Sequence, residues 1–199
     1  MKLLSLREVI EAIANCDDDM DVYQRYAWVY ADGDDPIGKQ RFYLSSDHEE
    51  VETNSRCLHP YLEAATFADV LSVQKRQNPL STETDYARAL EFYVDKDTFL
   101  DSNESGISVE HPNLSKGLYH EYDLTLEHCP ADRVGDAARA VSAVRGLLLR
   151  QALISCRTPP VVLAERVNAK ACREIESRFA VLSLPLTRRT YQPLAWLLS

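Results

Sequence analysis

The feature that most constrains this chain is a reversal of charge about half-way along it. Residues 1–110 carry 10 lysines and arginines against 23 aspartates and glutamates, whereas residues 111–199 carry 12 against 8. Residues 101–117, DSNESGISVEHPNLSKG, lie at the reversal and have the Ser, Asn, Gly and Pro content of a linker. We therefore expect an acidic α+β domain over 1–100, a linker over 101–118, and a second α+β domain over 119–199 that ends in an apolar tail.

The composition is that of an ordinary globular chain. The 199 residues are 45% hydrophobic and 27% charged, and no apolar run approaches the length that spans a bilayer. Arg7, Glu8 and Glu11 interrupt the N-terminal segment where a signal peptide needs apolar residues. The five cysteines are scattered and odd in number, which favours reduced thiols. These features predict a cytoplasmic protein that does not bind membranes.

Hydrophobic periodicity in the acidic half predicts helices around a β-hairpin. Ser5 followed by Glu8 is a capping-box pattern before an apolar stripe at helical spacing. Two segments dense in aromatic and β-branched residues predict strands, and residues 32–36 between them predict a turn. The expected elements are a helix over 6–15, strands over 21–31 and 40–45, an irregular stretch over 46–59, and helices over 66–77 and 83–99.

The second half predicts a small sheet covered by helices. The segments that favour strands stand at its two ends, and Pro159-Pro160 interrupts the helical segments between them. The expected order is βαααβ, which makes a compact α+β sandwich. Its elements are a strand over 121–129, helices over 133–146, 147–156 and 168–179, and a strand over 180–186.

A stretch covering roughly residues 120–187 resembles the C-terminal domain of the bacterial ribosomal stalk protein. The resemblance rests on EYDLTLE at 121–127, on RVGDAARAVSAVRGLLLRQALISC at 133–156, and on a proline-leucine-glutamate-valine pattern followed by an apolar helix face. These last two features comprise Pro160, Leu163, Glu165, Val167, Cys172, Ile175 and Phe179. The resemblance implies the α+β fold of that domain and a surface that contacts translation factors.

The basic surface of that family is changed in this chain. Arg133, Arg139 and Arg145 keep positive charge, whereas Leu148 replaces a junction glycine. Lysines of the family are replaced by Val134 and Leu153. The same scaffold serves other adaptors, such as the substrate adaptor of the Clp protease, so the fold alone does not define the role.

A fainter resemblance lies in the acidic half. Residues 66–99, TFADVLSVQKRQNPLSTETDYARALEFYVDKDTF, are similar to the end of a small uncharacterised bacterial family that accompanies interbacterial toxin loci. Acidic proteins of that setting are commonly immunity proteins, which neutralise a toxin by binding it. The resemblance therefore implies a protein partner.

Motifs for catalysis or cofactor binding are not evident in the sequence. The histidines form no HxxxH or HExxH pair, no two cysteines have zinc-site spacing, and no phosphate-binding glycine loop or GxSxG elbow occurs. The segment DGDDPIG resembles a calcium loop, but Pro36 and Tyr43 stand where ligands belong. We therefore expect no enzymatic activity, no metal and no cofactor.

An acidic run follows the first expected helix and is the main candidate for partner binding. At the C-terminus of a helix the macrodipole disfavours negative charge by about 0.3–1 kcal/mol per group. The run is interpreted either as a solvated loop or as part of an acidic patch for a basic partner, whose charges would speed association. The candidate residues are Asp17, Asp18, Asp19, Asp21, Asp32, Asp34, Asp35, Glu49 and Glu50.

The expected hairpin also carries aromatic residues on two faces, and one face belongs to the core. Tyr23 and Arg25 are the candidate interface anchors on the other face, because Tyr, Trp and Arg dominate binding hot spots. The alternative is plain cross-strand packing.

These observations favour a cytoplasmic immunity protein, or antitoxin, that binds a basic cognate toxin and covers its active site. Nucleic acid is not expected as a partner because the acidic half repels phosphates. The expected state is a monomer or weak dimer. The alternative function is a translation-linked adaptor that binds a GTPase factor or the ribosome through the stalk-like half. A third possibility is an enzyme whose site is not evident in the sequence.

Overall fold

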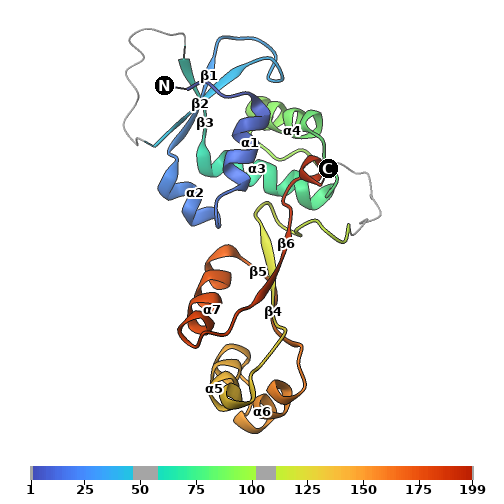
Figure 1. Ribbon diagram of the computed structural model, residues 1–199. Coiled ribbons are helices and arrows are strands. Elements are labelled where there is room, and N and C mark those ends of the chain that lie inside the picture. Colours follow the sequence, from blue (N-terminus) through green and yellow to red (C-terminus); the bar gives the residue numbers. More distant parts are fainter. Residues whose placement is uncertain (1, 47–57, 102–110, 199) are drawn as a thin grey trace. The chain divides into compact units, whose positions relative to one another are not determined.

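The computed structural model describes residues 2–46, 58–101 and 111–198. It divides the chain into two units, Met1–Tyr119 together with Gln192–Ser199, and His120–Tyr191. Each unit has helices and a three-stranded antiparallel sheet of its own, which confirms the α+β class (Figure 1). The tail over 192–199, which the sequence analysis placed in the second domain, belongs to the first unit.

The sheet of the first unit has the order β2-β1-β3. The expected hairpin is formed by β1 (Trp28–Asp32) and β2 (Arg41–Ser45), with Tyr30 opposite Tyr43. The third strand, β3 (Leu58–Glu63), lies partly in the stretch that was expected to be irregular. It contains Pro60, which the sheet tolerates because β3 is an edge strand.

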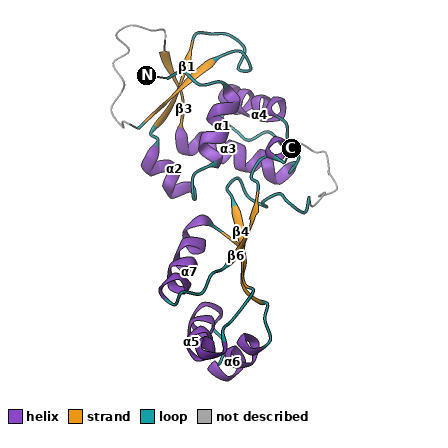
Figure 2. Ribbon diagram, viewed as in Figure 1, coloured by secondary structure: helices purple, strands orange, loops and turns teal. Residues whose placement is uncertain are grey.

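In the described part of the first unit, four helices accompany this sheet (Figure 2). They are α1 (Leu6–Ala14), α2 (Asp19–Arg25), α3 (Ala64–Gln77) and α4 (Glu83–Lys96). Helix α3 is central, because it contacts β1, β3, α2 and α4, while α1 packs on β2 and α4. The expected helices at 6–15, 66–77 and 83–99 are therefore confirmed, with ends shifted by one to three residues.

Helix α1 forms for the reason that its sequence indicates. The Ser5 hydroxyl accepts a hydrogen bond from the Glu8 backbone N–H, and the Ser5 N–H donates to the Glu8 carboxylate at 2.7 Å. The reciprocal pair satisfies backbone donors that the first helical turn leaves without partners. The apolar stripe of the helix is fully buried and consists of Leu6, Val9, Ile10 and Ile13.

Helix α2 corrects the prediction of a strand over 21–31. Residues 21–25 are helical, and the strand begins only at Trp28. Asp18 caps the new helix, so that its first turn contains Asp19 and Asp21. Negative charge is favoured at a helix N-terminus, which reverses the electrostatic penalty expected for this acidic run.

Thr82 is the N-cap of α4, and its side chain forms a second capping box with Asp85. The buried face of the helix includes Tyr86 and Leu90. In the following turn, Tyr93 packs against the core and Val94 is exposed.

The expected linker over 101–118 is only in part a connection. Within its described part, Leu114 and Leu118 are buried, and Leu118 belongs to the core of the first unit. The Ser115 N–H donates to the Gln192 carbonyl at 2.8 Å. The Gln192 N–H donates in turn to the Asn113 carbonyl at 2.9 Å, so this segment pairs with the C-terminal tail.

The tail completes the core of the first unit. Leu194 is fully buried there, and the Trp196 indole N–H donates to the Glu11 carboxylate at 2.9 Å. The Trp196 ring also lies edge-on against Tyr86, with ring centroids 5.8 Å apart. The fully buried Lys75 ammonium donates to the Pro193 carbonyl. The tail therefore folds back on the half of the chain that precedes residue 120.

The second unit has the order βααβαβ. Its sheet is β5-β4-β6, and α7 packs on β4 while α5 contacts α6, α7 and β5. A short 3-10 turn lies at Ala131–Arg133, directly before α5. A similar turn, Ala195–Leu197, belongs to the tail of the first unit. The elements are β4 (Glu121–Leu126), α5 (Val134–Arg145), α6 (Leu149–Arg157), β5 (Val161–Val167), α7 (Ala169–Val181) and β6 (Thr187–Tyr191).

Two strands of this unit differ from the expected order. Strand β5 lies between α6 and α7, where the sequence analysis placed no strand. The prediction of a strand over 180–186 is wrong, because α7 continues to Val181 and β6 begins at Thr187. The chain leaves the helix through Ser183, which has a positive φ of 54°.

The tail provides a test of the first unit. Leu194→Ala should lower the free energy of unfolding by about 2–5 kcal/mol, because it leaves a cavity in a closed core. Val181→Ala on α7, a side chain that is 85% exposed, should change it by less than about 0.5 kcal/mol. Urea denaturation of both variants measures the difference. Equal effects of the two substitutions would show that the tail does not pack in the core.

Candidate functional site

The acidic run at 17–21 is a structured helix start and not an irregular loop. The Asp18 carboxylate accepts a hydrogen bond from the Asp21 N–H at 2.9 Å. The Asp21 carboxylate accepts one from the Asp17 N–H, also at 2.9 Å. The two bonds hold the carboxylates of Asp18 and Asp21 in fixed positions around the N-terminus of α2.

Arg25 lies on the same helix but is paired with Asp21. Its guanidinium contacts both carboxylate oxygens of Asp21 at 2.8 Å, one turn earlier. The hydrogen bond to Asp21 raises the pKa of Arg25 above its ordinary value. The pair neutralises one aspartate of the run. Arg25, which was expected to be an anchor on the outer face of the hairpin, is therefore engaged within a helix.

A second element contributes to the same surface. The Tyr119 hydroxyl donates to the Asp19 carboxylate at 2.6 Å. Burial raises the pKa of Tyr119, and the bond to Asp19 raises it further. On α3, burial and the nearby Asp19 charge raise the pKa of Asp69. Asp69 and Tyr119 were missed by sequence reasoning, because tertiary packing alone brings them to α2.

Two exposed apolar side chains lie among these carboxylates. Tyr23 is 56% exposed and Met20 is 61% exposed, although the helix that carries them buries Val22. They are three residues apart and so share one side of α2. We call this set the α2 surface: it consists of Asp17, Asp18, Asp19, Met20, Asp21, Tyr23, Asp69 and Tyr119.

The remaining predicted residues form a separate group. Asp32 ends β1 opposite Arg41, and Asp34 and Asp35 are exposed in the turn that follows. Strand β1 separates this turn from α2, so the two groups lie at opposite ends of one strand. Glu49 and Glu50 lie outside the described residues. The single acidic patch expected from the sequence is thus divided in two.

Helix α4 adds carboxylates to the group at the turn. Glu91 and Asp95 line a pocket of about 560 Å³ together with Asp34 and Asp35. The Ile37 N–H, in the turn, donates to the Glu91 carboxylate at 3.4 Å. Sequence analysis did not associate α4 with the turn, because 54 residues separate Ile37 from Glu91.

The second unit has a surface of the opposite charge. Leu148 is 73% exposed at the junction of α5 and α6, and Leu149 and Ile154 are also exposed. On α6, Arg150, Ile154 and Arg157 recur at the spacing of one helical face. Of the arginines noted in the sequence, Arg133 and Arg139 both pair with Asp136 on α5, and each pair lies within the first turns of that helix.

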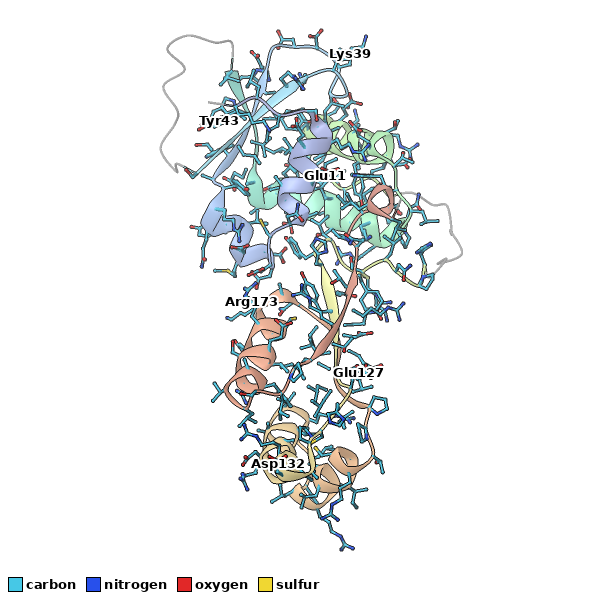
Figure 3. All side chains as sticks on the ribbon, in the orientation of Figure 1. Glu11, Lys39, Tyr43, Glu127, Asp132 and Arg173 are labelled. Atoms are coloured by element: carbon cyan, nitrogen blue, oxygen red, sulfur yellow. The ribbon has the colours of Figure 1, made fainter. Side chains whose placement is uncertain are left out.

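Figure 3 shows the side chains of both units, with residues such as Glu11 on α1 and Lys39 in the turn between β1 and β2 labelled. Among the described residues, no three His, Cys, Asp or Glu side chains converge closely enough to hold a metal ion. The cysteines at 16, 129, 156 and 172 are unbridged, and burial raises the pKa of the Cys16 thiol to about 11. Cys16 is therefore a protonated, unreactive thiol at neutral pH.

No family model, no curated protein and no solved structure matches this chain. In the part of the chain that the structure describes, the helices are too short or too polar to cross a membrane. The function of the chain is therefore inferred from its own residues and contacts.

The cap of α2 can be tested directly. Asp18→Ala should lower the free energy of unfolding by about 1 kcal/mol, because it removes the oxygen that accepts the Asp21 N–H. Asp18→Asn keeps that oxygen and should have a much smaller effect. Urea denaturation of the two variants measures the difference. If both variants are as stable as the parent chain, Asp18 does not organise the α2 surface.

Proposed function

We propose that this chain is an immunity protein that binds a basic toxin domain through the α2 surface and occludes its active site. The observation that carries the proposal is the position of Tyr23, an exposed aromatic side chain on a short helix whose first turn carries carboxylates. The faint resemblance of residues 66–99 to proteins of toxin loci points in the same direction.

The α2 surface has the features of a protein-binding surface. Tyrosine contributes a large contact area at low entropic cost, and Met20 adapts to an irregular partner. Three of the carboxylates, those of Asp18, Asp19 and Asp21, each accept a hydrogen bond from a backbone N–H or from the Tyr119 hydroxyl, so that little of their side-chain freedom is lost when a partner binds. A basic partner would be attracted over distances of about the Debye length.

The electrostatics of this surface also favour a cationic partner. Burial raises the pKa of Asp69, and repulsion by the nearby Asp19 charge raises it further. Bringing positive charge to this surface would relieve that repulsion, whereas an anionic partner would increase it. The same reasoning disfavours nucleic acid.

The direct test is co-expression with the product of the gene immediately upstream. The upstream gene product should inhibit growth when it is expressed alone. Co-expression of this chain should restore growth, and the two proteins should co-purify. The complex should weaken between about 0.1 M and about 1 M salt, over which the Debye length falls from about 10 Å to about 3 Å. Absence of both rescue and complex would contradict the proposal.

Tyr23→Ala tests the contribution of the tyrosine side chain to binding, because it leaves the charge of the α2 surface unchanged. It should weaken the complex by about 2 kcal/mol, or roughly 30-fold, without changing stability, because the side chain is exposed. Val181→Ala, which truncates an exposed apolar side chain on α7, should leave binding unchanged. Titration calorimetry measures both. Equal affinity of the two variants would exclude Tyr23 as an anchor.

A second candidate function is a translation-linked adaptor, and the exposed apolar junction of α5 and α6 favours it. Leu148, Leu149 and Ile154 stand beside exposed arginines, which would suit an acidic partner with an apolar groove. This function predicts co-sedimentation with ribosomes or elongation factors that is lost in Leu148→Asp and kept in Tyr23→Ala. Absence of co-sedimentation, or co-sedimentation that Leu148→Asp does not change, would contradict this second function.

A further inference from the structure

Two cysteine thiols of the second unit are in contact and lie outside the α2 surface. Cys129 follows β4 in a loop, and Cys156 lies in the last turn of α6. The Cys156 thiol is buried, and the partly exposed Cys129 packs against the same hydrophobic core. Their side chains are hydrogen-bonded to each other. Both thiols are unbridged, so the pair is in its reduced form.

The pairing of β4 with β5 brings these two cysteines together. Leu126, the last residue of β4, lies opposite Val161, the first residue of β5. Cys129 follows Leu126 by three residues, and Cys156 precedes Val161 by five. The chain therefore leaves the sheet through Cys129 and returns to it through Cys156 at the same end of the sheet (Figure 1). The strand register thus places the two thiols side by side in the native fold.

The two thiols have the composition of a disulfide site and not of a metal site. A structural zinc ion takes four ligands, and a catalytic one takes three. Among the described residues, no third His, Cys, Asp or Glu side chain lies close enough to complete such a group with this pair. Two thiols in contact without a third ligand can still undergo thiol–disulfide exchange.

The hydrogen bond gives the two thiols different roles. Burial, together with the adjacent Cys129 sulfur, raises the pKa of Cys156 to about 11. Burial also raises the pKa of Cys129, but the hydrogen bond from Cys156 acts in the opposite direction. A hydrogen bond donated to a sulfur favours its thiolate, so the Cys156 S–H is the donor and the Cys129 sulfur the acceptor. Because the thiolate is the nucleophile, the partly exposed Cys129 reacts first.

We propose that Cys129 and Cys156 form a reversible disulfide when the chain meets a low-molecular-weight disulfide such as oxidised glutathione. The Cys129 thiolate attacks one sulfur of the glutathione disulfide, and one glutathione leaves as a thiolate. The Cys156 sulfur, on losing its proton, attacks the Cys129 sulfur of the mixed disulfide and releases the second glutathione. Two protein thiols are oxidised and one glutathione disulfide is reduced. The two protons that the cysteines lose are taken up by the two released glutathione thiolates.

The disulfide ties α6 to the end of the sheet. Helix α6 packs chiefly on α5. The bond links its last turn to the loop after β4 and closes a loop over residues 129–156, which contains both helices. A closed loop lowers the entropy of the unfolded chain, so oxidation stabilises the α5–α6 pair. This site goes beyond the immunity function and does not depend on the identity of any partner.

The test oxidises the full chain under native conditions. The protein is incubated with oxidised glutathione and alkylated, and its peptides are analysed by mass spectrometry without reduction. A peptide pair linked through Cys129 and Cys156 should be the main product, and an excess of reduced glutathione should remove the link. Absence of this pair, or links that join the cysteines in random combinations, would overturn the proposal.

Three serine variants separate the roles of the thiols. In Cys156→Ser, a mixed disulfide with glutathione should accumulate on Cys129, because no second thiol is present to displace it. In Cys129→Ser, the buried Cys156 should remain reduced. Cys172→Ser is the matched control, because Cys172 is equally buried in the same core but contacts Glu176 and Arg188 instead of a cysteine. This control should form the 129–156 link at the rate of the parent chain. Equal oxidation of Cys156 with and without Cys129 would overturn the proposed order of attack.

Thermal unfolding measures whether the disulfide belongs to the native fold. The oxidised chain should unfold about 10 °C higher than the reduced chain, the effect expected from closing a loop of this length. The Cys129→Ser variant treated with oxidised glutathione should show no such rise. A lower melting temperature after oxidation of the parent chain would show that the bond distorts the fold, and would overturn the proposal.

Discussion

The first unit depends on a buried lysine that is met by the C-terminal tail. Lys75 on α3 is fully buried, and its ammonium donates to the carbonyl of Pro193, 118 residues later. Removing one partner from a buried charge is strongly destabilising, so the tail has a fixed place in this unit. Leu194 and Trp196 then pack in the core that α1 and α4 begin. The second unit is in effect inserted into the first, between Tyr119 and Gln192.

This arrangement leaves α2 available for binding. The short helix buries only Val22, so its other side chains are not needed for the core. Its aspartates are held by its own cap and by Tyr119, which also lies at the point where the chain leaves the first unit. An acidic surface with an exposed tyrosine follows from these constraints. That combination supports the proposal of a cationic protein partner.

Sequence reasoning predicted the elements that local signals specify. The capping box at Ser5 indicated the first helix, and the aromatic pattern indicated the hairpin. It was wrong at 21–25, where the aromatic content favours a strand but the cap at Asp18 favours a helix. It missed β3 and β5, because each depends on pairing with a distant strand. The pairing of residues 113–115 with the tail was missed for the same reason.

The candidate site was predictable in its charges and not in its geometry. The aspartates between 17 and 21 and Tyr23 were recognisable from residue type, and they lie on α2 or directly before it. Asp69 and Tyr119 reach that helix through tertiary packing, which no local pattern signals. Glu91 and Asp95 likewise join the turn after β1 from a distant helix. The separation of the two acidic groups by β1 depends on where that strand begins, which the sequence did not specify.

The most direct test of the central claim is amide hydrogen exchange on the chain alone and in complex with the upstream gene product. The proposed function predicts slower exchange in the complex at residues 17–25, which form and precede α2, and no change at residues 145–157. Slower exchange confined to 145–157, at the junction of α5 and α6, would contradict it and would assign the partner to the second unit.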